Sequence, residues 1–191
     1  MATRLPIDER LDTAGDLVAR ARIFYDIWRF YEGAETRPAN LGAMNQYSEF
    51  FKFDTHAHFL SFIVYIAALL EARGDTINFP ALIGEFERTK LIAPEIIAEA
   101  RTILAQVEPL RLKVIILRSN LFAHRSASLS YAEAFAKAKL TPNQLRDLTD
   151  LALRLANRLL VERGLQEQFF HEPSLEHAKA MLQKLGATNV A

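Results

Sequence analysis

Apolar side chains recur every three or four residues along almost the whole chain, which is the spacing of one face of an α-helix. The pattern is clear in a long first helix expected from Asp8 to about Tyr31. It returns after Thr141 as one continuous stripe of Leu145, Leu148, Ala152, Leu155 and Leu159. No segment shows the two-residue period of a β-strand, and no internal repeat is found. The sequence therefore predicts an all-α fold, a helical bundle of about six to eight helices.

Turn residues and prolines divide this pattern into separate helices. We expect a loop at about 32–38, a long helix over about 45–73 and a short helix over about 81–90. Pro94 can occupy the first turn of the next helix. Pro109 lies inside the pattern and predicts a break or kink.

A further helix is expected from Pro109 to about His124. This helix and the one over 45–73 are apolar on nearly every side, so we expect both at the centre of the core. Three more helices are expected after it. Capping boxes open two of them at Ser130 and Thr141, and the last begins at Ser174.

The composition excludes several classes of protein. The chain has 191 residues, which fits a single domain over 1–191, and no cysteine, which excludes disulfides, cysteine nucleophiles and thiolate zinc sites. Its seven glycines are never spaced as in a dinucleotide-binding or phosphate-binding loop. Lys and Arg total 23, as do Asp and Glu, so any contact with nucleic acid must come from a local basic patch.

The N-terminal segment is charged almost at once and lacks the apolar core of a signal peptide. The most apolar stretch, 59–70, is shorter than the ~20 residues that a membrane span needs. We therefore expect a cytoplasmic protein without membrane contact.

One segment combines an apolar helix with an abrupt polar end: VIILRSNLFAHR, from Val114 to Arg125. On a helix, Asn120 and His124 share a face because they are four residues apart. Arg111, Arg118 and Arg125 are spaced by seven and form one line of positive charge. Burying an arginine without partners costs several kcal/mol, so this polar end needs an explanation.

Arginine and histidine together suit phosphodiester chemistry on RNA without a metal ion. An imidazole such as His124 can take the proton of a ribose 2′-hydroxyl, because its ordinary pKa is about 6.5. A guanidinium such as Arg118 can hold the scissile phosphate through two hydrogen bonds and offset the charge of the transition state. Asn120 can orient either group. Cleavage of this kind leaves a 2′,3′-cyclic phosphate.

The spacing of Arg118 and His124 along the chain, taken alone, favours a structural role for both residues over catalysis. Arg118 would then cap helix carbonyls or pair with an acid, and His124 would mark the end of the helix.

The segment Arg118-Ser119-Asn120-Leu-Phe-Ala-His124 resembles the arginine–histidine signature of HEPN domains, the higher eukaryote and prokaryote nucleotide-binding superfamily. The aromatic-rich helix and the loop with a short helix that precede this segment resemble the abortive-infection U-type branch. The resemblance covers about 10–165, and we expect 166–191 to be a C-terminal helical extension. In place of the Asn, Asp or His common after the arginine, this chain has Ser119, with Asn120 one residue later.

The resemblance implies an all-α homodimer that joins through the motif helices and cleaves RNA. It assigns Arg118 and His124 as the catalytic pair, with Ser119, Asn120, Arg111 and Arg125 as accessory or RNA-binding residues. It also implies a toxin–antitoxin or phage-defence role, with an antitoxin or a nucleotidyltransferase as a possible partner protein. Two alternatives stay open at this stage: a non-catalytic HEPN module that binds a nucleotide, RNA or protein, and a purely structural helical interaction protein.

Other candidate groups point to packing or solvent. His56 and His58 are two residues apart, so on a helix they diverge by ~200° and cannot easily share an ion. We expect no metal site and no cofactor. Solvated positions are expected for His171, His177, Glu85, Glu87, Glu95 and Glu99. Core or dimer contacts, rather than base stacking, are expected for Phe50, Phe51, Phe53, Phe59 and Phe62.

Overall fold

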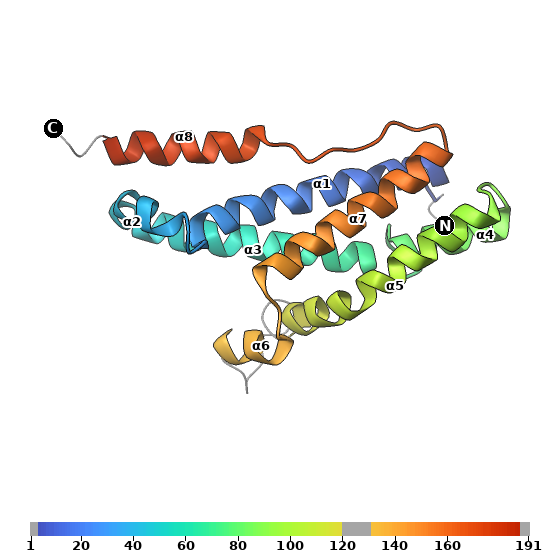
Figure 1. Ribbon diagram of the computed structural model, residues 1–191, viewed down its shortest axis with the longest axis horizontal. Coiled ribbons are helices and arrows are strands. Elements are labelled where there is room, and N and C mark those ends of the chain that lie inside the picture. Colours follow the sequence, from blue (N-terminus) through green and yellow to red (C-terminus); the bar gives the residue numbers. More distant parts are fainter. Residues whose placement is uncertain (1–3, 120–130, 188–191) are drawn as a thin grey trace.

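The helices of the chain run mostly along one direction and form an elongated bundle (Figure 1). A computed structural model describes residues 4–119 and 131–187, and in these residues the regular structure is entirely helical. The helices are α1 (Ile7–Glu32), α2 (Arg37–Gln46), α3 (Ser48–Leu70), α4 (Phe79–Thr89), α5 (Pro94–Leu117), α6 (Tyr131–Ala138), α7 (Pro142–Glu162) and α8 (Pro173–Ala187). The predicted all-α bundle is confirmed.

The core lies where α1 packs between α3 and α7, with α5 closing the far side of α7 (Figure 1). The apolar stripe of each helix supplies it, and the most deeply buried side chains include Leu11, Val18, Phe62, Ile66 and Leu148. A second, smaller cluster forms where α8 lies on α1 and α2, around Tyr31, Met44 and Leu182. The C-terminal helix is therefore packed onto the bundle rather than projecting from it.

The segment 37–46 forms helix α2, and the chain turns at Tyr47 before α3 begins. The loop expected at 32–38 therefore ends at Thr36, and the helix expected over 45–73 is divided in two. The start of α2 is explained by Pro38, which occupies its first turn. Proline is tolerated there because the N–H it lacks has no partner inside the helix, so Pro38 starts a helix instead of prolonging a loop.

The prediction that one helix breaks at Pro109 and another begins there is wrong, since α5 continues through Pro109 from Pro94 to Leu117. Pro109 is exposed, and buried side chains in the turns on either side, such as Val107 and Val114, fix the same face of the helix against the core. Tertiary packing thus outweighs the hydrogen bond that the proline removes.

The predicted start of α7 is confirmed. The Thr141 hydroxyl accepts from the Gln144 backbone N–H, and the Gln144 side chain accepts from the Thr141 N–H, which completes a capping box. After the helix, Gly164 has a φ of +68°, a left-handed conformation that glycine adopts without steric cost.

Among the described residues, α3 is long and apolar enough to cross a membrane by length and composition. One face of it is buried against α1, as in the core helix of a globular protein. Its other face leaves Phe50, Phe53 and Val64 exposed. The aromatics of this helix are thus divided, since Phe51, Phe59 and Phe62 are buried as expected.

Candidate functional site

Arg118 lies at the end of α5, at the edge of the core. Val114 and Leu117 are fully buried one turn earlier, which fixes the orientation of the helix end. Arg118 and Ser119 continue the helix as a π-helical turn, and both are partly buried. Three other predicted site residues, Asn120, His124 and Arg125, lie outside the described residues.

The guanidinium of Arg118 forms a bidentate ion pair with Glu71. Its Nη1 lies 2.5 Å from Oε2 and its Nη2 lies 3.3 Å from Oε1. Both side chains are about three-quarters buried, with 25% and 26% of their surfaces exposed. Since Glu71 is the residue that ends α3, the pair ties the end of α3 to the end of α5.

Glu71 is the partner of Arg118 that the sequence interpretation missed. The sequence contained one weak indication of this role, which follows from the helix dipole. A carboxylate that follows directly on an apolar helix lies at the negative end of the helix dipole, which disfavours it unless a cation is close. The Arg118 hydrogen bond holds the pKa of Glu71 below its usual range, and the charges of Arg73 and Arg111 lower that pKa further. The carboxylate is therefore ionised at neutral pH.

One donor atom of Arg118 is not hydrogen-bonded to any described residue. Its Nε is buried and has no hydrogen-bond partner among the described residues. An unpaired buried N–H costs about 1–3 kcal/mol, so a group that accepted from it would gain that amount. Arginine donates from Nε and Nη in one plane, which matches two oxygens of a carboxylate or phosphate.

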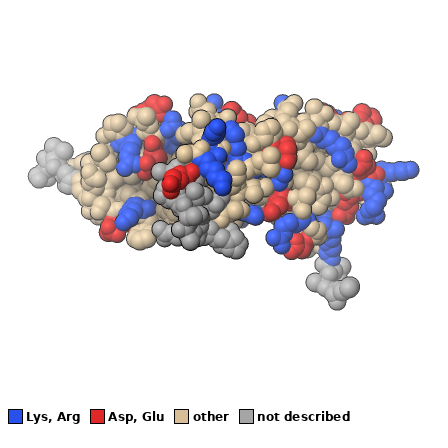
Figure 2. Space-filling view, turned by 90° about the horizontal axis from the view of Figure 1, so that it is seen from below, with Lys and Arg blue, Asp and Glu red and all other residues tan. Residues whose placement is uncertain are grey.

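The predicted line of positive charge is balanced where the structure describes it. Arg111 donates to both carboxylate oxygens of Glu108, at 2.6 Å and 2.5 Å. Arg118 is paired with Glu71 in the same way. Figure 2 agrees, because blue and red side chains are interspersed over the face it shows.

The histidines and glutamates set aside in the sequence have structural partners or surface positions. Nδ1 of His58 lies 2.8 Å from the Asp54 carbonyl oxygen, one turn earlier in α3. His171 and His177 are exposed. The residues described here contain no cluster of three or more His, Asp and Glu side chains able to hold a metal ion. Ion pairs join Glu85 to Arg10, Glu87 to Arg101 and Glu99 to Arg158.

Comparison with known protein families shows which family this chain belongs to. The model of the AbiU2 family of HEPN domains matches residues 5–181. The chain belongs to this family. The match covers all eight helices in whole or in part, including most of α8, so it extends beyond the 10–165 that the motif and its flanking helices indicated.

Searches of curated proteins and of solved structures gave no match. Membership of the AbiU2 family makes the chain an abortive-infection-associated HEPN module. The sequence interpretation located the HEPN signature at the Arg118 end of α5.

Proposed function

We propose that this HEPN module is a metal-independent endoribonuclease of an abortive-infection or toxin–antitoxin system. In this mechanism His124 removes the proton from a ribose 2′-hydroxyl, and the oxygen attacks the adjacent phosphate. The P–O5′ bond breaks and the leaving 5′ oxygen takes up a proton from the imidazolium or from water, which gives a 2′,3′-cyclic phosphate and a 5′-hydroxyl end. Arg118 binds the phosphate and stabilises the negative charge that develops on its oxygens.

The observation that supports this proposal is the state of Arg118. A partly buried arginine is held in one orientation at a helix end, and its buried Nε has no acceptor among the described residues. A guanidinium with a purely structural role would be expected to have that donor satisfied as well. A phosphate oxygen that reached this edge of the guanidinium would give Nε an acceptor.

We propose further that the chain acts as a homodimer, with the Arg118 ends of the two α5 helices near the two-fold axis. A two-fold axis there would place two copies of the arginine and the histidine around one groove. Val64, exposed on the outer face of α3 two turns before Glu71, offers apolar surface for such contact. Light scattering at micromolar concentration is expected to give the mass of two chains, and a monomer would contradict the dimer.

The decisive experiment is RNA cleavage in EDTA by the wild type and by Arg118→Ala and His124→Ala. Arg88→Ala is the matched control, because Arg88 is an exposed cation on α4, outside this site. Loss of a general base lowers cleavage by about 10²–10⁴-fold. We expect that loss for His124→Ala, a comparable loss for Arg118→Ala and none for Arg88→Ala. Cleavage that survives His124→Ala would contradict the mechanism.

A second candidate function is a non-catalytic module that binds RNA or a protein partner through the same surface. The Arg118–Glu71 pair favours this binding role, because Glu71 neutralises the charge of the guanidinium. Wild-type protein that binds RNA without cleaving it, and loses binding on Arg118→Ala, would establish this alternative. A partner such as an antitoxin or nucleotidyltransferase would then be expected to cover the same helix end.

A further inference from the structure

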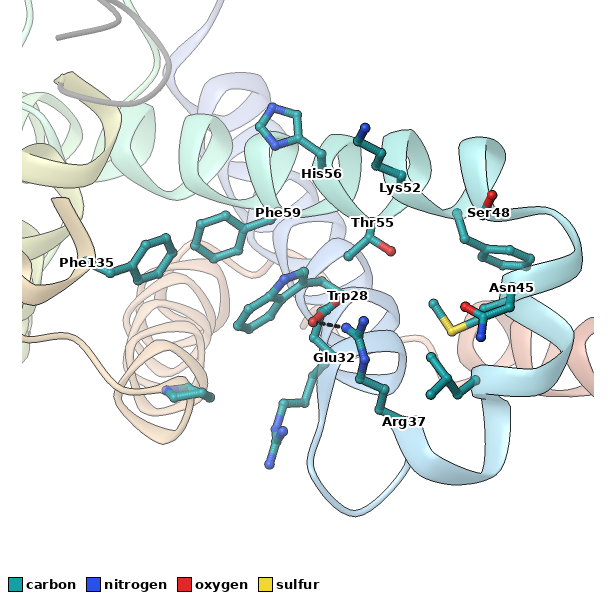
Figure 3. Close-up of a pocket in the computed structure, with 15 residues that line it drawn as sticks. Trp28, Glu32, Arg37, Asn45, Ser48, Lys52, Thr55, His56, Phe59 and Phe135 are labelled. Atoms are coloured by element: carbon teal, nitrogen blue, oxygen red, sulfur yellow. Dashed lines mark ion pairs between the residues drawn. The ribbon is translucent and has the colours of Figure 1, made fainter. Parts of the chain in front are cut away.

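A cavity of about 600 Å³ lies apart from the Arg118–Glu71 pair. Residues of α1, α2, α3, α6 and α7 line it, and neither member of that pair is among them (Figure 3). Small-molecule sites usually enclose about 300–1,000 Å³ and are lined mostly by apolar and aromatic side chains, with a few polar groups. The cavity therefore has the size of a ligand site, and its lining indicates which class of ligand it can bind.

One wall of the cavity is aromatic. The Trp28 ring lies 4.6 Å from the Phe59 ring, and the Phe59 ring lies 5.4 Å from the Phe135 ring in a stacked arrangement. Leu41 and Met44 extend the apolar lining from α2. Trp28 is only partly buried, and Figure 3 shows its indole beside the open space of the cavity. A flat apolar group that covered this wall would remove apolar surface from water, which favours its binding.

The charged side chains around the cavity are paired or directed elsewhere. Arg37 forms an ion pair with Glu32, and Arg29 forms one with Glu35 at 2.9 Å. The Lys52 amine is directed away from Arg37 (Figure 3). An anionic ligand would have to displace a carboxylate from an arginine, whereas a neutral ligand leaves both ion pairs in place. The electrostatics of the cavity therefore favour a neutral molecule.

A hydroxyl in the cavity wall is buried without a hydrogen-bond partner among the described residues: Oγ1 of Thr55, on α3. In three other helices Thr13, Thr89 and Thr102 donate to the carbonyl oxygen four residues earlier, at 2.8, 2.7 and 2.9 Å. Thr55 forms no such bond in the part of the chain that the structure describes, and its side chain extends from α3 on the side of the cavity (Figure 3). A hydroxyl can donate and accept, so one polar atom of a ligand would satisfy it.

We propose that this cavity is a ligand site, separate from the motif, that binds a small neutral aromatic molecule with one hydrogen-bonding group. The ring of the ligand lies against Trp28, and its polar group bonds to the Thr55 hydroxyl. Both ion pairs beside the cavity stay intact. The site goes beyond the proposed function, because no residue that lines it belongs to the arginine–histidine pair or to the accessory residues of that pair.

N-phenylnaphthylamine tests the site, since it is neutral and aromatic and carries a single N–H group. It fluoresces strongly only in apolar surroundings, so its emission reports binding to the full-length protein. We expect a saturable rise in emission with a single site per chain. The anion anilinonaphthalene sulfonate has the same ring system and is expected to bind about tenfold more weakly, because its charge finds no free partner in the cavity. Absence of saturable binding of the neutral probe, or tighter binding of the anion, would overturn the proposal.

A matched set of variants locates the site. Leu41 lines the cavity and is exposed, so Leu41→Ser removes an apolar contact without changing the buried core. Leu112 on α5 and Phe53 on α3 are exposed apolar residues that do not line the cavity. Leu41→Ser is expected to weaken binding of the neutral probe about fivefold, and Leu112→Ser and Phe53→Ser are expected to bind it like the wild type. Binding that survives Leu41→Ser, or is lost on Phe53→Ser, would overturn the location.

Thr55→Val separates a ligand contact from a structural role. Since the hydroxyl is buried and unpaired in the described residues, its replacement by a methyl group is expected to leave the thermal midpoint unchanged or raise it. The same change is expected to weaken binding of the neutral probe about fivefold, the effect of one lost hydrogen bond between neutral groups. A lower thermal midpoint with unchanged binding would assign the hydroxyl to the fold and contradict its role in the site.

Discussion

Arg118 and Glu71 are 47 residues apart in sequence, yet two hydrogen bonds join them at the ends of α5 and α3. The pair fixes the direction of the guanidinium plane. It also keeps a carboxylate ionised at the end of an apolar helix, where the helix dipole opposes it. The position of the proposed phosphate clamp thus depends on both helices.

Replacement of Arg118 by lysine is expected to lower the kcat for RNA cleavage by about 100-fold. Lysine keeps the positive charge and can pair with Glu71, but it cannot donate two parallel hydrogen bonds in one plane. Steady-state cleavage of a short RNA in EDTA gives the comparison. Near-wild-type kcat would mean that charge alone suffices at this position.

Glu71→Gln tests the positioning of Arg118 rather than its charge. We expect kcat to fall about tenfold with little change in KM, because a misplaced clamp stabilises the transition state less. The measurement is the separate determination of kcat and KM. A rise in activity would instead mean that Glu71 competes with the substrate for the guanidinium.

Acid is expected to destabilise the fold through its depressed carboxylates. Arginine hydrogen bonds lower the pKa values of Asp8, Glu71, Glu85 and Glu108 in the folded chain. The unfolded chain therefore binds protons first as pH falls, so this stabilisation is complete above about pH 5 and declines below about pH 4.5. Urea unfolding between pH 7 and pH 3 measures it.

Glu85→Gln is the informative variant for this pH effect, because Arg10 is the most buried cation of these pairs. At pH 7 the change is expected to cost about 2 kcal/mol, since it leaves a buried guanidinium without its counter-charge. Between pH 5 and pH 3 the variant is expected to lose less stability than the wild type. Equal losses would mean that Glu85 contributes nothing to the acid response.

Pro109→Ala is expected to stabilise the protein by about 1–2 kcal/mol, because it restores an N–H and removes a steric clash inside α5. Pro142→Ala is the matched control. Pro142 occupies the first position of α7, where proline is favourable, so its replacement is expected to leave stability unchanged or lower it slightly. Thermal unfolding of both variants provides the test, and equal effects would contradict this explanation of how α5 tolerates its proline.

Two phenylalanines of α3 are expected to respond in opposite ways. Phe62 is 0% exposed and packs on Tyr25, so Phe62→Ala is expected to cost about 3–5 kcal/mol of unfolding free energy. Phe53 is 67% exposed, so Phe53→Ala is expected to change that free energy by less than about 0.5 kcal/mol. A large loss from Phe53→Ala would mean that this face is covered in the native assembly.

The sequence by itself determined most of the helices, since helical periodicity and helix caps depend on residues within one or two turns of each other. The Thr141–Gln144 capping box is local in this sense and was predicted, and the left-handed Gly164 follows from the same kind of local rule. The arginine–histidine motif was also readable, because its members are six residues apart.

Only the tertiary structure decided which of these local tendencies prevailed. Packing of Val107 and Val114 keeps α5 continuous through Pro109, although the local rule predicts a break. The partner of Arg118 is a glutamate at the end of another helix, and the cavity beside Trp28 is lined by residues of five helices, α1, α2, α3, α6 and α7. Neither has a sequence pattern, because each depends on contacts between residues far apart in the chain whose geometry is fixed only when the helices pack.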